Sequence, residues 1–181
     1  MFIALEGLQG VGKSTVYHEL QSRLDNTWKI VPSISKEIND TRKIVDLSGN
    51  ADARYLFYLS QVILSGKVIE SLLNQNNNVL IESYIFRTIT YHEGVGSSLT
   101  FSPTQFDIPK PNKVFYLACE DLERIKRINS RNKRVGFWNE LAETHNTQIK
   151  AKYAELMDKM IVIDTTFISP QDTVEKILSL I

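Results

Sequence analysis

Short apolar runs alternate along the chain with longer segments in which apolar residues recur every three or four positions. Short runs of this kind are typical of buried strands, and the longer segments are typical of amphipathic helices. The runs predict strands over Phe2–Leu5, Trp28–Val31, Asn78–Glu82, Lys113–Leu117 and Met160–Ile163. The longer segments predict helices over Lys13–Leu24, Glu37–Leu47, Ala51–Asn74, Ile85–His92, Glu120–Ser130, Phe137–Met157 and Pro170–Leu180. Because helices separate the strands, the pattern predicts an α/β fold with a parallel sheet covered by helices.

The predicted helix at residues 51–74 is apolar over much of its circumference between Tyr55 and Leu64. A helix that is apolar on more than one side lies either in the core of its domain or against another subunit. Both interpretations remain open, and we favour a homodimer in which this helix forms the shared face.

The first apolar run is followed at once by a glycine-rich stretch, "EGLQGVGKST", at residues 6–15. It matches G-x-x-x-x-G-K-[ST] through Gly7, Gly12, Lys13 and Ser14, and it lies between a predicted strand and a predicted helix. Glycines let successive backbone N–H groups point at an anion, and the following helix adds the positive end of its dipole. The simpler alternative, a glycine-rich turn that only joins strand to helix, does not explain why motif, position and flanks agree.

We therefore expect residues 7–15 to bind a nucleoside triphosphate, with Lys13 at the β- and γ-phosphates and the Ser14 hydroxyl on Mg²⁺. The residues expected to bind the phosphates are Gly7, Gln9, Gly10, Val11, Gly12, Lys13, Ser14 and Thr15.

Composition adds limits rather than a function. The 181 residues favour a single domain, 1–181. Lys plus Arg and Asp plus Glu both total 21, so we expect no nucleic-acid partner. The single cysteine, Cys119, allows no internal disulfide, which favours a reducing compartment such as the cytoplasm. The densest apolar stretch, "YLFYLSQVILSG", is shorter than the roughly 20 residues that a membrane span needs, and the first residues, "MFIALEG", lack the basic start of a signal peptide.

Four segments carry a resemblance to a known family. They are "FIALEGLQGVGKST" at the start, "VLIESYIFRTITYHEG" at 79–94, "LERIKRINSRNKR" at 122–134 and "MIVIDTT" at 160–166. Over nearly the whole chain the sequence resembles the thymidylate kinase family and the related deoxynucleoside kinases. The resemblance implies a P-loop NTPase fold, a three-layer sandwich whose five-stranded parallel sheet has the order 2-3-1-4-5 and helices on both faces. It also implies an enzyme that uses ATP and Mg²⁺ to phosphorylate a nucleotide or a nucleoside.

The second segment supplies candidate acceptor-binding residues. Glu82 lies at the carboxyl end of an apolar strand, where parallel α/β sheets bind ligands. By its match to the family, Glu82 holds Mg²⁺ or helps to activate the acceptor; the alternative is a solvated acid at a strand end. Tyr84, Arg87 and Tyr91 follow at spacings of three and four, so they share one helix face. That face suits a planar base or a phosphate, and it equally suits packing with the rings inside.

Two further parts of the chain border this segment. Of the three histidines, which show no metal-binding spacing, only His92 is a candidate for lining an acceptor pocket. Residues 94–112, rich in Gly, Ser and Pro, predict a long loop, and such loops tend to be functional or mobile. We interpret this loop as a candidate cover for the acceptor pocket.

The third segment is basic, and its match to the family implies a lid over residues 124–137. Phosphoryl transfer needs positive charge near the equatorial oxygens of the transferring group. We expect Arg131 and Arg134 to have this catalytic role together with Lys13 and Glu82, whereas Arg124 and Arg127 match helix positions and are expected to be partly structural. The alternative is a solvated basic helix face.

The chain departs from the family at the acceptor site. The family usually has Arg-Glu-Pro after the second strand, Asp-Arg in the long helix, Asp-Arg-Tyr after the third strand and an aspartate in the phosphate loop. Here the corresponding residues are "IVPSISKEI", Ser60-Gln61-Val62, Glu82-Ser83-Tyr84 and Gln9. Three positions that normally neutralise an acceptor monophosphate are therefore uncharged, and Gln9 replaces an acid that faces the sugar.

These departures leave three interpretations. In the first, the acceptor is a nucleoside monophosphate. Its dianionic phosphate needs cations in a closed site, and the candidates are Arg87, Lys36 and Arg42. Alternatively, the acceptor is a neutral nucleoside, with Glu37 as a loose counterpart of the acid that follows the second strand in deoxynucleoside kinases. In the third interpretation the protein binds ATP but has a degenerate acceptor site. In the first two, Gln9, Tyr84, Arg87 and Tyr91 are the residues expected to face the acceptor.

Overall fold

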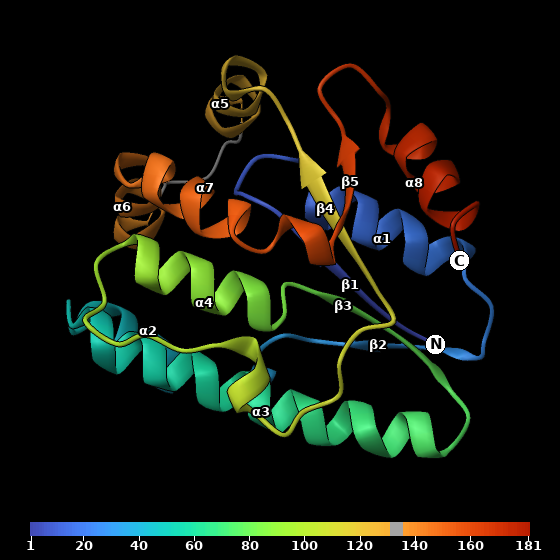
Figure 1. The fold of residues 1–181 in the computed structure, drawn as a ribbon, viewed down its shortest axis with the longest axis horizontal. Helices are drawn as coiled ribbons and strands as arrows, with labels where there is room; N and C mark the ends of the chain where they lie inside the picture. The colour runs from blue at the N-terminus through green and yellow to red at the C-terminus, as the bar shows by residue number, and fades with distance from the viewer. Residues whose placement is uncertain (131–135) are drawn as a thin grey trace.

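A computed structural model describes residues 1–130 and 136–181 of the chain. Its five strands form one parallel sheet in the order β2-β3-β1-β4-β5, which confirms the expected α/β fold and strand order (Figure 1). The strands are β1 (Phe2–Glu6), β2 (Trp28–Val31), β3 (Asn78–Glu82), β4 (Lys113–Ala118) and β5 (Ile161–Asp164). All residues of β1 are buried, as its unbroken apolar run predicts for a central strand covered on both faces.

Helices cover both faces of this sheet. They are α1 (Lys13–Arg23), α2 (Asn39–Leu47), α3 (Ala51–Asn74), α4 (Ile85–Gly94), α5 (Asp121–Asn129), α6 (Phe137–Thr144), α7 (Asn146–Ala154) and α8 (Pro170–Leu178). Helix α1 packs against α8 on one face, whereas α4 packs between α3 and α7 on the other (Figure 1). Right-handed crossovers between parallel strands dictate this distribution, because the chain moves in opposite directions along the sheet after β1 and after β2.

The single helix expected over residues 137–157 is wrong, because the chain forms two helices there. Helix α6 ends at Thr144, and the backbone of His145 leaves the helical region with φ −103° and ψ 21°. The His145 ring donates from Nδ1 to the carbonyl oxygen of Leu141 at 2.9 Å, which supports the bend. The bend lets α6 lie beside the acceptor cavity described below while α7 packs on α4.

The contact between α4 and α7 is unusually close at Gly94. A Cβ atom on Gly94 would lie 2.5 Å from Cγ1 and 3.0 Å from Cα of Ile149. A separation below 3.0 Å to a neighbouring side chain, with backbone just behind it, leaves no room for a larger residue. Helix α7 also carries Tyr153, whose hydroxyl reaches back to the end of β1.

Helix α3 is long and apolar enough to cross a membrane by length and composition alone. In this fold, however, it packs beside β2 and β3, and its buried face includes Arg54 and Gln61. The same helix also exposes large apolar side chains on its outer side, at Leu56, Ile63, Leu64 and Val68.

Candidate active site

The phosphate loop joins the end of β1 to the start of α1 and depends on its glycines. Gly7, Gly10 and Gly12 all have positive φ angles, of 134°, 89° and 98°, which other residues rarely adopt. A Cβ atom on Gly7 would lie 2.5 Å from the carbonyl oxygen of Leu117, so this position also needs the space. Lys13 is buried and donates from Nζ to the carbonyl oxygen of Leu8 at 2.7 Å. The loop thus curls around its own lysine.

Contacts from outside hold the loop in this shape. Arg124 of α5 donates from Nη1 to the carbonyl oxygen of Gln9 at 3.1 Å. Thr165, just after β5, donates from Oγ1 to the carbonyl oxygen of Val11 at 2.9 Å. A cavity of about 160 Å³ lies inside the loop and is lined by Gln9, Gly10, Gly12, Lys13, Ser14, Thr15, Glu82, Ser83 and Arg87. Its backbone and its lysine suit a chain of phosphates.

Ser14 and Glu82 meet at this cavity, as the sequence predicts. The Ser14 hydroxyl donates to Oε1 of Glu82 at 2.8 Å. Their oxygens are of the type that Mg²⁺ prefers, and Mg²⁺ is usually held by one or two protein carboxylates together with waters and phosphates. Among the described residues no group of three or more His, Cys, Asp and Glu could hold a metal ion.

A larger cavity, of about 470 Å³, opens beside the phosphate loop and shares Ser14, Glu82, Ser83 and Arg87 with it. We call it the acceptor cavity. Its further walls come from α2, α3, α4 and α6, through Arg42, Arg54, Tyr58, Tyr91, His92 and Asn139. A molecule bound here would have one end next to the terminal phosphate of a triphosphate in the loop.

Two predicted acceptor-binding residues, Arg87 and Tyr91, line the acceptor cavity together. The Arg87 guanidinium lies 5.1 Å from the centre of the Tyr91 ring and donates from Nη1 to the carbonyl oxygen of Gly7 at 3.3 Å. Gln9 borders two smaller neighbouring cavities instead. Its Oε1 is buried and has no hydrogen-bond partner among the described residues.

The structure places Tyr84 differently from the prediction. The residue before it, Ser83, has a positive φ of 63°, and the chain turns there so that the Tyr84 side chain enters the core. The ring is fully buried, with its edge against Phe2 at 5.4 Å between centroids. The alternative with the ring inside is therefore correct for Tyr84, and the expectation that it faces the acceptor is corrected.

The loop 94–112 is also corrected as a cover for the acceptor. Ser97 and Ser98 donate to the carboxylate of Asp52 at the start of α3, and Phe101 packs edge-on against Tyr55. These contacts attach the loop to α3 and α4 away from the acceptor cavity, and the described residues that line the cavity include none from it. Glu37 is exposed and bonded by Ser35, and it does not line this cavity either.

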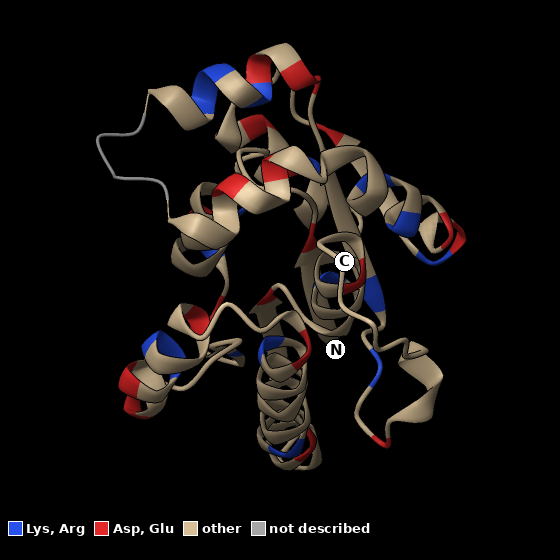
Figure 2. Ribbon diagram, turned by 90° about the vertical axis from the view of Figure 1, so that its left-hand side faces the viewer, with Lys and Arg blue, Asp and Glu red and all other residues tan. Residues whose placement is uncertain are grey.

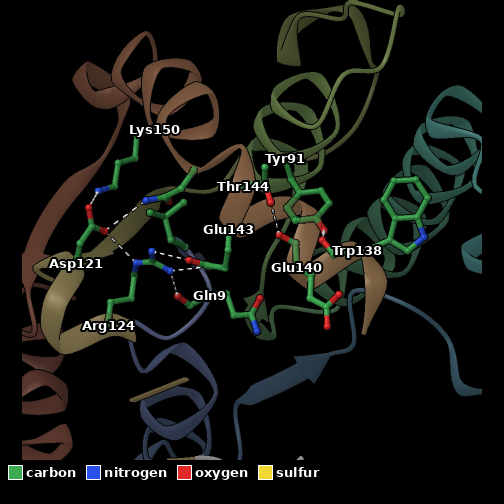
Figure 3. Close-up of polar contacts among 12 residues, drawn as sticks. Gln9, Tyr91, Asp121, Arg124, Trp138, Glu140, Glu143, Thr144 and Lys150 are labelled. Atoms are coloured by element: carbon green, nitrogen blue, oxygen red, sulfur yellow. Dashed lines mark hydrogen bonds and ion pairs between the residues drawn. The ribbon is translucent and has the colours of Figure 1, made fainter. Parts of the chain in front are cut away.

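The predicted lid is only partly within the described residues. Arg131 and Arg134 lie outside them. Arg124 is almost fully buried and makes two bonds to Glu143 of α6, at 2.7 and 2.8 Å, besides its bond to the phosphate loop (Figure 3). Arg127 donates from Nη2 to the carbonyl oxygen of Thr165 at 2.8 Å. Both arginines therefore have the structural contacts that were expected of them.

Arg54 is the main site residue that the sequence analysis missed. It is buried in the wall of the acceptor cavity and donates from Nε to Asp46 at 2.8 Å and from Nη1 to Nε2 of His92 at 2.9 Å. Burial is the main reason why the pKa of His92 is lowered to about 3, and the neighbouring Arg54 charge adds to the effect. The sequence did contain a signal for Arg54. It lies four and eight residues before Tyr58 and Val62, so it shares a helix face with the stretch where the family usually has the arginine of Asp-Arg.

Glu6 was missed as well. Its carboxylate is fully buried beneath the phosphate loop, and it accepts from the Tyr84 backbone N–H at 2.9 Å and from the Tyr153 hydroxyl at 3.3 Å. Burial raises the pKa of Glu6 to about 7, although Arg87 and Lys13 oppose the shift. Glu6 therefore links β1 to the turn that carries Ser83.

The family model described as "Thymidylate kinase" matches residues 5–177. The chain belongs to the thymidylate kinase family. It is 28% identical over 191 residues to a protein of Methanococcus maripaludis named "Probable thymidylate kinase", with 99% of this chain and 94% of that protein covered. A Methanocaldococcus jannaschii protein of the same name is 27% identical over 186 residues, with 98% and 94% covered.

Solved structures show the same fold. A Candida albicans thymidylate kinase superposes with a TM-score of 0.78 at 17% identity, covering 99% of this chain and 89% of that one. A deoxyadenosine kinase from M. mycoides gives 0.68 at 19% identity, covering 99% and 98%. As a member of the thymidylate kinase family, the protein is a nucleotide kinase that transfers the γ-phosphoryl group of ATP to a nucleoside monophosphate. The two alternative interpretations, a nucleoside kinase and an ATP-binding protein with a degenerate acceptor site, are not favoured.

Proposed function

We propose that the acceptor is thymidine 5′-monophosphate and that the reaction requires Mg²⁺. The observation that carries this proposal is that Arg42, Arg54 and Arg87 all line the acceptor cavity. Arg42 and Arg54 share the single carboxylate of Asp46, so the three arginines keep a net positive charge that a phosphate dianion would balance and a neutral nucleoside would not. The cavity therefore contains arginines, although they are not at the positions where the family usually has them. The relatives from both Methanococcus and Methanocaldococcus are named for the same acceptor.

In this proposal each end of the site has a defined role. The loop amides and Lys13 bind the β- and γ-phosphates, and Ser14 and Glu82 hold Mg²⁺, which neutralises charge between those phosphates when bound. Arg87 holds the acceptor phosphate next to them. Arg131 and Arg134 are proposed to reach the transferring group.

The test is ATP turnover with thymidine monophosphate, the other deoxynucleoside monophosphates and thymidine itself, with Mg²⁺ or with excess chelator. We expect turnover with the monophosphate and Mg²⁺ only. Lys13→Ala should lower kcat/KM by about 100-fold or more, because an oriented charge at the phosphates is removed. Lys29→Ala, an exposed lysine of β2, is the matched control and should keep the wild-type rate. Turnover of thymidine but not of its monophosphate would contradict the proposal.

We also propose that two copies of the chain associate through α3 in the cytoplasm. Between Arg54 and Lys67 this helix has no charged residue, and the helix at the bottom of Figure 2 is correspondingly free of charge along its middle. Its outer side exposes Leu64 by 60% and Val68 by 52%. A contiguous apolar stripe of this kind on a soluble enzyme marks an interaction surface.

A further inference from the structure

Helix α6 forms part of the wall of the acceptor cavity but buries little apolar surface of its own. Of its eight residues only Trp138 and Ala142 are buried. Asn139, next to Trp138, is the residue of α6 that lines the cavity. A short helix is normally held in place by the packing of its buried face. With so little packing, the position of Asn139 depends on the polar contacts that α6 makes at its two ends.

The first turn of α6 is attached to two other walls of the acceptor cavity. Trp138 donates from Nε1 to the backbone oxygen of Asp46 in α2 at 2.6 Å, and its own backbone oxygen accepts from the Tyr91 hydroxyl of α4 (Figure 3). These bonds hold the beginning of α6 and leave its other end to be held from elsewhere.

The last turn of α6 is held by Glu143. Its carboxylate accepts from Nη1 and Nη2 of Arg124 at 2.7 and 2.8 Å, so the two side chains meet fork to fork (Figure 3). Such a pair fixes direction as well as distance. Glu143 lies four residues after Asn139, so the two share one helix face and are roughly 6 Å apart along the axis. A shift of Glu143 is therefore transmitted to Asn139 within about one helical turn.

The same guanidinium is attached to the phosphate loop. Besides its pair with Glu143, Arg124 donates from Nη1 to the carbonyl oxygen of Gln9 at 3.1 Å. Helix α5 also packs so closely on the loop that a Cβ atom on Gly10 would lie 2.9 Å from the carbonyl oxygen of Arg124. Arg124 cannot move without disturbing the loop, so it is a fixed point to which both the loop and the end of α6 are tied.

We propose that Glu143 is a positioning residue for the acceptor: through Arg124 it holds the α6 wall of the acceptor cavity at a set distance from the phosphate loop. Phosphoryl transfer needs the reacting atoms roughly 3–3.5 Å apart and aligned, so the two substrate sites need a common anchor. The bond from Arg124 to Gln9 serves the ATP site, and its pair with Glu143 serves the acceptor site. This inference rests on the proposed function, because it assumes that a nucleoside monophosphate fills the cavity.

The experiment measures KM separately for ATP and for thymidine monophosphate. Glu143→Gln keeps the size of the side chain but removes its charge and one of the two accepting oxygens. We expect KM for thymidine monophosphate to rise about tenfold, because a charged hydrogen bond is lost, and KM for ATP to stay within about twofold, because Arg124 still holds Gln9. Arg124→Lys lacks the planar fork that serves both partners and should raise both constants.

Glu140→Gln is the matched control. It removes the same charge from an exposed carboxylate of the same helix, three residues before Glu143, and both constants should keep their wild-type values. Asp121→Asn removes the other carboxylate beside Arg124, which pairs with Lys150 of α7 rather than with α6. KM for thymidine monophosphate should change by less than about twofold there, which separates the link to α6 from a loss of charge near the arginine.

The two KM values also distinguish positioning from a loss of stability. A variant that is only less stable contains less active protein, which lowers the apparent kcat and changes neither KM. An unchanged KM for thymidine monophosphate in Glu143→Gln, or an equal rise in both constants, overturns the inference and leaves the kinase proposal intact. No turnover of any monophosphate by the wild-type protein overturns both.

A second variant decides if Glu143→Gln unfolds at the assay temperature. Glu143→Asp keeps the charge but is shorter by one methylene group, so it reaches Arg124 only if α6 is drawn toward α5. KM for thymidine monophosphate should again rise while KM for ATP does not, and wild-type values of both constants would overturn the inference.

Discussion

Two buried residues at opposite ends of the site have pKa values shifted in opposite directions. Burial raises the pKa of Glu6 to about 7 and lowers that of His92 to about 3. In the unfolded chain Glu6 loses its proton near pH 4.5, so the folded protein holds more protons between pH 4.5 and 7, and the Glu6 contribution to stability falls as pH rises. His92 stays neutral when folded, so its contribution is lost as pH falls from 6.5 toward 3. Between pH 4.5 and 6.5 the two effects oppose each other.

Glu6→Gln should separate these effects. The amide keeps an oxygen for the Tyr84 N–H and can pair with the Tyr153 hydroxyl, but it does not ionise. We expect the free energy of unfolding of the variant, relative to wild type, to increase by up to about 3 kcal/mol as pH rises from 4.5 to above 7. Chemical denaturation across this pH range measures the difference, in which the His92 contribution cancels. A difference that does not change with pH would mean that Glu6 titrates normally.

For single residues, prediction from sequence succeeded where the backbone conformation allows only certain residue types. Gly7, Lys13 and Ser14 have fixed spacings because the loop has one shape. Glu6 gave no signal, because an acid at a strand end is normally solvated, and its burial here depends on residues far away in the sequence, such as Tyr84 and Tyr153. Tyr84 was misassigned for a related reason: the periodicity describes a helix face, but Tyr84 precedes α4 and follows the turn at Ser83.

Among the elements, the spacing of α4 and α7 depends on Gly94. Gly94→Ala would place its new methyl group against both the side chain and the backbone of Ile149, so we expect a loss of about 2 kcal/mol in the free energy of unfolding. Gly136→Ala is the matched control, because no described residue lies within 4 Å of a Cβ atom there and φ is −82°. Its stability should change by less than about 0.5 kcal/mol. Thermal and denaturant unfolding of both variants provide the comparison, and equal losses would refute the packing argument.

The strands and most helices followed from hydrophobic periodicity, whereas the break at His145 did not. Both α6 and α7 continue a helical pattern, and histidine is not a helix breaker. The bend depends on tertiary contacts, since Trp138 bonds α2 while Ile149 packs on α4. The hydrophobic periodicity of residues 137–157 does not show that the two halves of this segment pack against different helices.

For the whole molecule, the exposed stripe of α3 predicts a dimer. Leu64→Glu places a charge in the middle of the stripe and should convert a dimer into a monomer without lowering the melting temperature of the monomer fold. Leu122→Glu changes an equally apolar residue of α5 that is 87% exposed, and it should leave the dimer intact. Sedimentation velocity at micromolar concentration distinguishes the species. A wild-type protein that sediments as a monomer would exclude this interface.

The order of the strands in the sheet is the feature of the whole molecule that a single sequence does not determine. Alternating strands and helices predict a parallel sheet, but they do not state which strands are neighbours. The order β2-β3-β1-β4-β5 came from the family resemblance, and the position of the acceptor cavity depends on it, because β1 and β3 lie side by side and bring Ser14 to Glu82.

The outward contacts of the phosphate loop have a thermodynamic consequence. In a planar trans peptide the C=O and N–H bonds point in opposite directions. Since Arg124 holds the Gln9 oxygen and Thr165 holds the Val11 oxygen, the N–H groups of Gly10 and Gly12 are aimed the other way before any ligand arrives. The entropy of ordering the loop is therefore lost when the chain folds, and triphosphate binding should show only a small unfavourable conformational entropy in calorimetry.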